Sequence, residues 1–181
     1  MSTPKFINVI DVEATCWQDE PPNDVMRTPR NEIIEVGITK IDIATRELIV
    51  TRSIIVLPVR TEVSEFCTQL TTLTPEFVSK FGIPFRDMCN ILSNEFKSDS
   101  SVFASFGDYD KDIFKRNCIQ NKVAYPLGRY HLNVKSLFVA KMGFSLGAKK
   151  ACEYMGIKFE GTHHRGSDDS LNIAKLLLKL L

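Results

Sequence analysis

A short apolar run near the start of the chain limits the possible folds more than any other feature. Residues 6–13 read Phe-Ile-Asn-Val-Ile-Asp-Val-Glu, an apolar and β-branched sequence that predicts a buried strand. Two acids, Asp11 and Glu13, lie at its end. Because side chains alternate along a strand, both carboxylates project from one face, about 6.6 Å apart along the strand. The fold must therefore accommodate two acids at the end of an interior strand.

This pair of acids has two interpretations. Carboxylates on one side of a strand can hold one divalent ion each, or share two ions about 3.5–4 Å apart. Alternatively, they mark the point at which a buried strand meets water. The D-x-E pattern is weak evidence by itself, and it is the apolar strand before it that favours a functional site.

The remaining pattern predicts an α/β fold with a mixed sheet of about five strands flanked by helices. Strands come early, as a hairpin of residues 32–42 and 47–58, and one further strand follows at 101–106. Residues 18–31 contain three prolines and predict a loop. Helices are expected after Thr74 and at 84–97, from 108 to 118, and near 134–142, 147–155 and 167–181. A length of 181 residues predicts a single domain over 1–181.

Composition excludes several classes of protein. With 44% apolar and 25% charged residues, the chain is neither collagen-like, disordered nor a coiled coil. Five cysteines at irregular positions without a C-x-x-C pair argue against a disulfide framework and a zinc ribbon, and indicate a reducing compartment. No apolar run approaches the roughly 18 residues of a membrane helix, and the first residues do not resemble a signal peptide. We therefore expect a cytoplasmic protein.

Charge is distributed unevenly along the chain. The net charge is only +1, but residues 115–150 carry eight lysines and arginines and no acid. Such a segment can be an electrostatic footprint for the phosphates of a nucleic acid. It can equally be the solvated face of a helix, and charge alone does not decide between the two.

Two later helices each carry one acid on the face expected to point inward. On the last helix Asp169 shares a stripe with Ile173, Leu176 and Leu180, whereas Asp168 lies on a polar face and is expected at the surface. By the same reasoning Asp110 is the inward acid of the helix after Gly107, and Asp108 is a cap or surface residue. A buried carboxylate needs a partner or a metal, although an acid in the first turn can also be satisfied by the free N–H groups of the helix.

Further candidates flank these acids. Tyr109 is either a core residue or a surface on which a base stacks. His163 and His164 lie between two glycines just before the last helix, where a general base for a cluster of acids would be needed. Histidines in such loops are more often structural or surface residues.

Taken together, these motifs resemble the DEDDh exonucleases of the ribonuclease-H-like superfamily. The shared signatures are Asp11-Val-Glu13, Asp110 after the fourth strand, and H-x(4)-D, which selects His164 and Asp169. Nearly the whole chain is covered. The segments Asp11–Cys16, Glu32–Glu35, Ser64–Cys67, Leu70–Pro75 and Gly161–Ala174 are most similar to the branch that contains the three-prime histone-mRNA exonuclease and the sporulation inhibitor KapD.

The resemblance implies 3′–5′ hydrolysis of single-stranded nucleic acid, RNA preferred, to nucleoside 5′-monophosphates with two Mg²⁺ or Mn²⁺ ions. It implies that the metal ligands are Asp11, Glu13, Asp110 and Asp169, and that His164 takes a proton from the attacking water. It also implies that Phe66 and Tyr109 clamp the terminal base and that backbone near Ala14 and Thr15 approaches the terminal nucleotide.

Several alternatives remain open at this stage. A DNA-directed proofreading or repair exonuclease would use the same mechanism, since contacts to the 2′-OH cannot be placed from the sequence. A non-catalytic nucleic-acid-binding module is disfavoured because all five site residues are present. A two-metal phosphatase is disfavoured by the basic segment and the aromatic residues. The oligomeric state, the physiological metal and the biological substrate are not predicted.

Overall fold

The computed structural model describes residues 5–18 and 31–181, so most of the loop predicted at 18–31 lies outside the described residues. In the described part a five-stranded sheet has the order β3-β2-β1-β4-β5. β1 is antiparallel to β2 and parallel to β4, β2 is antiparallel to β3, and β4 is parallel to β5. The strands are β1 (Phe6–Ala14), β2 (Ile33–Asp42), β3 (Glu47–Ile55), β4 (Val102–Ser105) and β5 (His131–Asn133). The predicted α/β class with a mixed sheet is confirmed.

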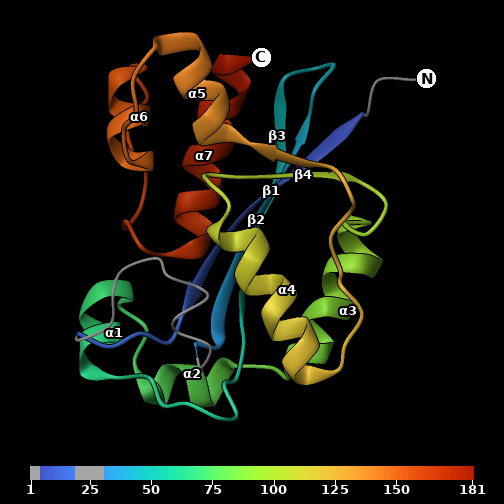
Figure 1. Ribbon diagram of the computed structural model, residues 1–181, viewed down its shortest axis with the longest axis vertical. Coiled ribbons are helices and arrows are strands. Elements are labelled where there is room, and N and C mark those ends of the chain that lie inside the picture. Colours follow the sequence, from blue (N-terminus) through green and yellow to red (C-terminus); the bar gives the residue numbers. More distant parts are fainter. Residues whose placement is uncertain (1–4, 19–30) are drawn as a thin grey trace.

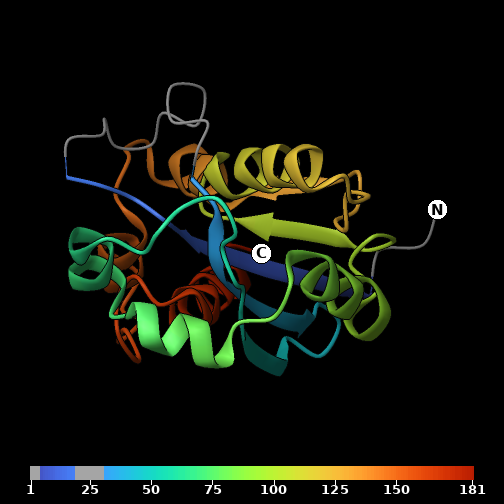
Figure 2. The same cartoon turned by 90° about the horizontal axis from the view of Figure 1, so that it is seen from below.

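Helices cover both faces of this sheet (Figures 1 and 2). They are α1 (Glu65–Thr71), α2 (Pro75–Phe81), α3 (Phe85–Phe96), α4 (Tyr109–Asn121), α5 (Val134–Met142), α6 (Ala148–Tyr154) and α7 (Gly166–Leu180). The predicted elements recur within a few residues, and Thr74 caps α2 by accepting a hydrogen bond from the Phe77 N–H. The sequence analysis did not predict α1 or β5, which have seven and three residues.

The alternation of side chains along β1 divides the core into two parts. Ile10 and Val12 pack with α3 and α4 on one face of the sheet. Ile7 and Val9 pack with α5, α6 and α7 on the other face. Asp11 and Glu13 occupy odd positions like Ile7 and Val9, so their side chains project toward the face that α7 covers. The centre of the sheet thereby presents both acids to the last helix.

Close packing of two glycines brings α7 against this face. A Cβ atom added to Gly37 on β2 would lie 1.8 Å from the carbonyl oxygen of Gly166, the first residue of α7. Only glycine permits this approach of two backbones. Since Gly37 is the strand partner of Asp11, the contact fixes the start of α7 beside the acids of β1.

Two expectations from composition can be compared with the structure. All five cysteines are free thiols, as their irregular spacing predicts. Among the described residues, no helix combines the length and the apolar character needed to cross a membrane.

Candidate active site

Three of the predicted acids meet at the end of β1. Asp11 and Glu13 come from the strand and Asp169 from the first turn of α7, and one carboxylate oxygen of each lies within 4.8 Å of those of the other two. Glu13 and Asp169 are buried, with 8% and 3% of their surfaces exposed, and Asp11 is half-buried. The structure therefore places Asp11 and Glu13 on one face, and Asp169 inward, as the sequence predicts.

Asp110 approaches the same place from the opposite side of the sheet. It is buried in the first turn of α4, and its Oδ1 accepts a hydrogen bond from the Val12 N–H at 3.0 Å. This contact joins the start of α4 to β1 between the two strand acids. Asp110 lines the same cavity as the other three, but it is not part of the group whose oxygens lie within 4.8 Å of one another.

Burial dominates the electrostatics of these carboxyls. It raises the pKa of Asp11 and of Glu13 well above the usual values, and the neighbouring acids, Asp110 and Asp169 among them, raise both further. Burial likewise raises the pKa of Asp110 to about 7, although hydrogen bonds from Val12 and Ser105 oppose that rise. The raised pKa values of these three carboxyls favour a bound cation, and the oxygen atoms of the acids that line the cavity suit hard ions such as Mg²⁺ and Mn²⁺.

Both histidines of the loop before α7 contact Asp169. The His163 Nδ1 lies 2.8 Å from Asp169 Oδ1, and the backbone N–H of His164 donates to Asp169 Oδ2 at 2.6 Å. Their rings stack with centroids 4.0 Å apart, and both line the cavity. His164 has a positive φ of 66°, and burial lowers its pKa. The sequence analysis selected His164 and did not predict the contact of His163 with Asp169.

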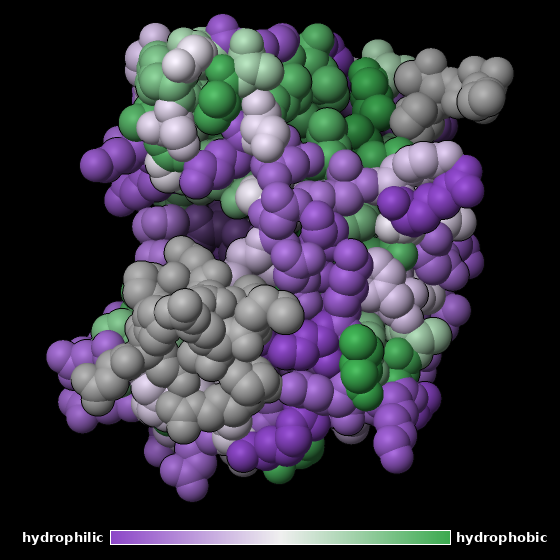
Figure 3. Space-filling view, viewed as in Figure 1, coloured by the Kyte–Doolittle hydropathy of each residue, from purple (hydrophilic) through white to green (hydrophobic). Residues whose placement is uncertain are grey.

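A cavity of about 690 Å³ opens over the acids. Of the residues predicted to bind substrate, Ala14, Phe66 and Tyr109 line it, whereas Thr15 does not line it and is fully buried. Phe66, on α1, has 38% of its surface exposed. On the face seen in Figure 3 the molecule is hollowed, and the atoms inside the hollow are hydrophilic. The lining includes Asn31 and Ala148, which no sequence motif singled out.

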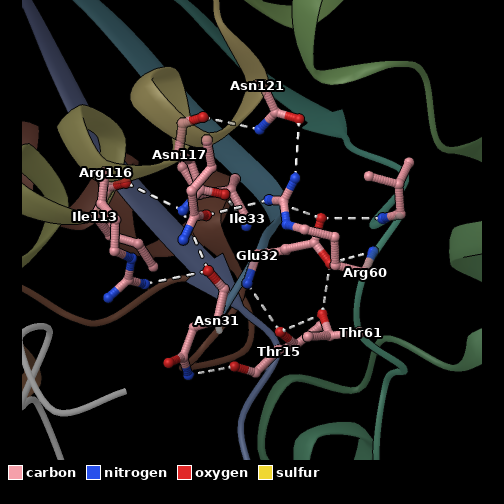
Figure 4. A network of polar contacts seen from close by, with 12 residues as sticks. Thr15, Asn31, Glu32, Ile33, Arg60, Thr61, Ile113, Arg116, Asn117 and Asn121 are labelled. Carbon is pink, nitrogen blue, oxygen red and sulfur yellow. Dashed lines mark hydrogen bonds and ion pairs between the residues drawn. The ribbon is translucent and has the colours of Figure 1, made fainter. Parts of the chain in front are cut away.

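A network of polar contacts fixes the backbone next to Ala14 and Asn31, which line the cavity (Figure 4). The Thr15 hydroxyl accepts from the Glu32 N–H at 2.9 Å, and the Thr15 carbonyl accepts from Asn31 Nδ2 at 2.5 Å. Glu32 in turn accepts from the Thr61 hydroxyl at 2.8 Å and from two backbone N–H groups of residues 59–60. Because Glu32 is buried, this network holds the end of β1 rigidly next to Ala14.

The acids expected outside the cluster do lie outside it. Asp108 is exposed, and it contacts Lys111 and Asn133 rather than capping α4 with its side chain. Asp168 accepts the Thr162 N–H at 2.7 Å. The polar face predicted around Asp168 needs one correction, because Asn172 is fully buried. Asn172 bridges α7 to the Glu160 backbone, with its Nδ2 donating to the carbonyl at 2.8 Å.

The segment of positive charge is less uniform than its sequence suggests. Its eight basic residues are spread over α4, α5, α6 and the loops between them. Arg116 is half-buried and donates to the Asn31 carbonyl at 3.1 Å, so it belongs to the structure around the cavity floor. Lys149 and Lys150 are exposed and directly follow Ala148 at the cavity edge.

The known proteins to which this chain is similar are exonucleases. The family model described as Exonuclease (RNase T) matches residues 8–177. The Bacillus subtilis protein named "Probable 3′-5′ exonuclease KapD" is 30% identical over 96% of this chain and 83% of its own length. Human 3′-5′ exoribonuclease 1 is 26% identical over 97% of this chain, which spans about half (52%) of that protein.

Solved structures extend the comparison to the fold. The nuclease domain of 3′hExo, a DEDDh family member bound to rAMP, aligns with a TM-score of 0.85 and 25% identity over 98% of this chain and 92% of that one. Pop2p of S. pombe, solved with Mg²⁺ and Mn²⁺ bound, has a TM-score of 0.74 over 96% of this chain and 81% of that one, and at 14% identity it shares the fold alone.

Proposed function

The chain belongs to the RNase T exonuclease family, and on that basis we propose that it is a metal-dependent 3′–5′ exonuclease acting on single-stranded ends, RNA preferred. The products would be nucleoside 5′-monophosphates. The observation that carries this proposal is the convergence of Asp11, Glu13 and Asp169 within 4.8 Å at the floor of an open cavity. A non-catalytic binding module would not need buried acids with raised pKa values.

The metal site would consist of Asp11, Glu13, Asp110 and Asp169. Two divalent ions held there would stabilise the attacking and leaving oxygens of an in-line displacement and lower the pKa of the attacking water. The two strand acids and Asp169 form the compact part of the site. Asp110, held by the Val12 N–H, would complete it from the α4 side.

His164 would act as the general base. It lines the cavity, and its backbone is anchored to Asp169, one of the proposed metal ligands. Burial lowers its pKa, so its imidazole is neutral at pH 7 and able to accept a proton from water. The left-handed backbone at His164 supports this role, since a non-glycine residue with positive φ commonly reflects a constraint imposed by its surroundings.

The 3′-terminal nucleotide would occupy the cavity above Ala14. Phe66 on α1 and Tyr109 on α4 both line it and offer two aromatic surfaces to one base. Thr15 would contribute through its rigidly held backbone rather than its side chain, which is used by Glu32 and Thr61. Stacking on aromatic residues requires an unpaired base, which favours single-stranded ends.

RNA preference is supported by the relatives rather than by a contact in this chain. Human 3′-5′ exoribonuclease 1 is named for RNA, and a solved relative with a TM-score of 0.82 and 23% identity, covering 99% of this chain and 82% of that one, recognises the 3′ end of a histone mRNA stem-loop. The exposed Lys149 and Lys150 beside the cavity would meet the phosphates of the incoming strand.

Matched substrates test the proposal. Single-stranded RNA and DNA of one sequence, labelled at either end, would be incubated with Mg²⁺ or Mn²⁺ or with chelator. We expect mononucleotides from the 3′ label, a ladder from the 5′ label, faster loss of RNA than DNA, and no cleavage in chelator. Faster loss of DNA would favour the DNA-directed alternative. Internal cuts, or no cleavage with either ion, would contradict the proposed activity. Asp169→Asn is the control for contaminating nuclease.

A further inference from the structure

An ion pair between the buried Glu35 and the half-buried Arg165 lies beside the acid cluster. Glu35, on β2, has none of its surface exposed and accepts four hydrogen bonds. Two come from Arg165, from Nε at 3.0 Å and Nη2 at 3.3 Å. The others come from the Gly166 N–H at 3.1 Å and the Ser53 hydroxyl at 2.5 Å. A forked contact between arginine and carboxylate fixes the direction of the guanidinium as well as its distance.

The pair connects the two parts of the chain that form the site. Glu35 is the strand partner of Glu13, so both side chains project from the same face of the sheet. Arg165 directly follows His164, and its carbonyl oxygen accepts the Asp169 N–H at 2.9 Å. Movement of Arg165 would therefore displace both the proposed base and a proposed metal ligand.

The charges of the pair also matter at this position. The Arg165 guanidinium bonds to Glu35, the strand partner of Glu13, so its positive charge lies close to the proposed metal ligands. Arg165 without Glu35 would place an uncompensated positive charge next to carboxylates that must attract cations. Folding alone does not require such a pair, because apolar residues commonly replace buried ion pairs without loss of stability.

We propose that Glu35 and Arg165 are positioning residues of the reaction: Arg165 holds His164 and Asp169 in place, and Glu35 directs Arg165 while cancelling its charge. This inference rests on the proposed function and deepens it. The two residues consequently contribute differently, one to position and the other to charge, and substitutions can separate these contributions. Loss of Glu35 removes a negative charge and leaves the charge of Arg165 uncompensated, whereas loss of Arg165 removes a positive charge.

Metal affinity and turnover should therefore respond differently in the two variants. Glu35→Gln keeps the size of the side chain, and we expect it to weaken Mn²⁺ binding about tenfold because Arg165 is left unpaired. Arg165→Gln removes a positive charge and leaves Glu35 negative beside the site, which should offset the displacement of Asp169, so we expect no weaker Mn²⁺ binding. The displacement of His164 should lower kcat by about 10–100-fold with little change in KM. The double variant, which is neutral, should regain Mn²⁺ affinity to within about threefold of the parent protein while kcat stays low.

The experiment uses the full chain freed of metal by chelator. Mn²⁺ binding is followed by electron paramagnetic resonance, cleavage by steady-state rates on single-stranded RNA, and folding by thermal melting. Arg165→Lys keeps the charge without the fork, and it serves if Arg165→Gln does not fold; we expect unchanged Mn²⁺ affinity and at least about tenfold lower kcat. Arg52→Gln, which breaks the exposed Arg52–Glu95 pair, is the matched control and should change neither quantity.

Two results would overturn the proposal. One is Mn²⁺ affinity and kcat within about twofold of the parent protein in both Glu35→Gln and Arg165→Lys. The other is equal weakening of Mn²⁺ binding in both, in proportion to a lower melting temperature, which is what a purely structural pair would produce. Failure of the parent protein to cleave RNA would instead contradict the proposed function, and the Mn²⁺ measurement does not depend on it.

Discussion

At the scale of single residues, substitution of the two adjacent histidines tests which of them is the general base. His164→Ala should lower the single-turnover rate by about 10²–10⁴-fold with little effect on RNA binding, because it would remove the proposed general base. His163→Ala should cost about tenfold or less, since Asp169 keeps its hydrogen bond from the His164 backbone at 2.6 Å. Rates from rapid mixing and affinities from fluorescence anisotropy would measure both. A greater loss in His163→Ala would transfer the role of base to His163.

Two pairs of neighbouring aspartates provide matched substitutions of identical chemistry. Asp169→Asn and Asp110→Asn should each nearly abolish cleavage. The loss of rate should exceed the roughly 10–100-fold that is typical when a residue supporting a metal ligand is replaced. Asp168→Asn and Asp108→Asn should retain most of the activity. An asparagine at 168 can still accept the Thr162 N–H through its carbonyl oxygen, and it loses only a helix-dipole interaction of about 0.3–1 kcal/mol.

Single-turnover cleavage of RNA by the four variants, with their folding checked by circular dichroism, decides this prediction. An inactive Asp168→Asn beside an active and folded Asp169→Asn would reverse the assignment of inward and outward acids on α7. The same reversal between residues 108 and 110 would reverse it on α4.

At the scale of elements, the contact between β2 and α7 should tolerate no side chain. Gly37→Ala would place a Cβ atom 1.8 Å from the Gly166 carbonyl, so α7 would have to move away from β2. We expect a loss of about 2–4 kcal/mol in the free energy of unfolding, measured in urea, together with lower activity. Gly147→Ala, with open space at its Cβ position, is the control and should change stability by less than about 0.5 kcal/mol. Equal stability of the two variants would contradict this packing.

The sequence predicted those site residues whose placement follows from one element alone. Asp11 and Glu13 share a face because strands alternate, and Asp169 points inward because its helix has an apolar stripe. The contacts of Glu35 could not be predicted in this way. Its contact with Arg165, 130 positions further along the chain, depends on the register of β1 and β2 and on the packing of Gly37 against α7. Likewise, the contact of His163 with Asp169 depends on the backbone turn at His164.

At the scale of the whole molecule, the clustered acids couple folding to pH. A carboxyl whose pKa is higher in the folded state stabilises the fold at low pH, and this stabilisation is lost as pH rises through the folded pKa. For Asp110 the window extends from about 4 to about 7. For Asp11 and Glu13, whose pKa values are also raised, stability likewise falls as pH rises. His131 and His164 act oppositely, because their lowered pKa values destabilise the fold only below about pH 6.5.

We therefore expect the melting temperature of the metal-free protein to fall between pH 6.5 and pH 8, above the histidine window. Mg²⁺ or Mn²⁺ should restore it most at pH 8, where the carboxylates are ionised. Scanning calorimetry in chelator and in excess metal measures both effects, and Asp110→Asn should reduce the fall. A melting temperature that rises over this range in chelator would contradict the raised pKa values.

The unequal lengths of β1 and β4 have a consequence for how such a site can arise. β4 pairs with β1 only from Ile7 to Val9, and along the next five residues of β1 no strand among the described residues pairs on that side. The hydrogen bond that a longer β4 would make to Val12 is supplied instead by the side chain of Asp110. A longer β4 would take the place at Val12 that Asp110 now occupies. The proposed active site therefore lies where regular strand pairing stops early, and the short β4 leaves a backbone N–H that Asp110 can use.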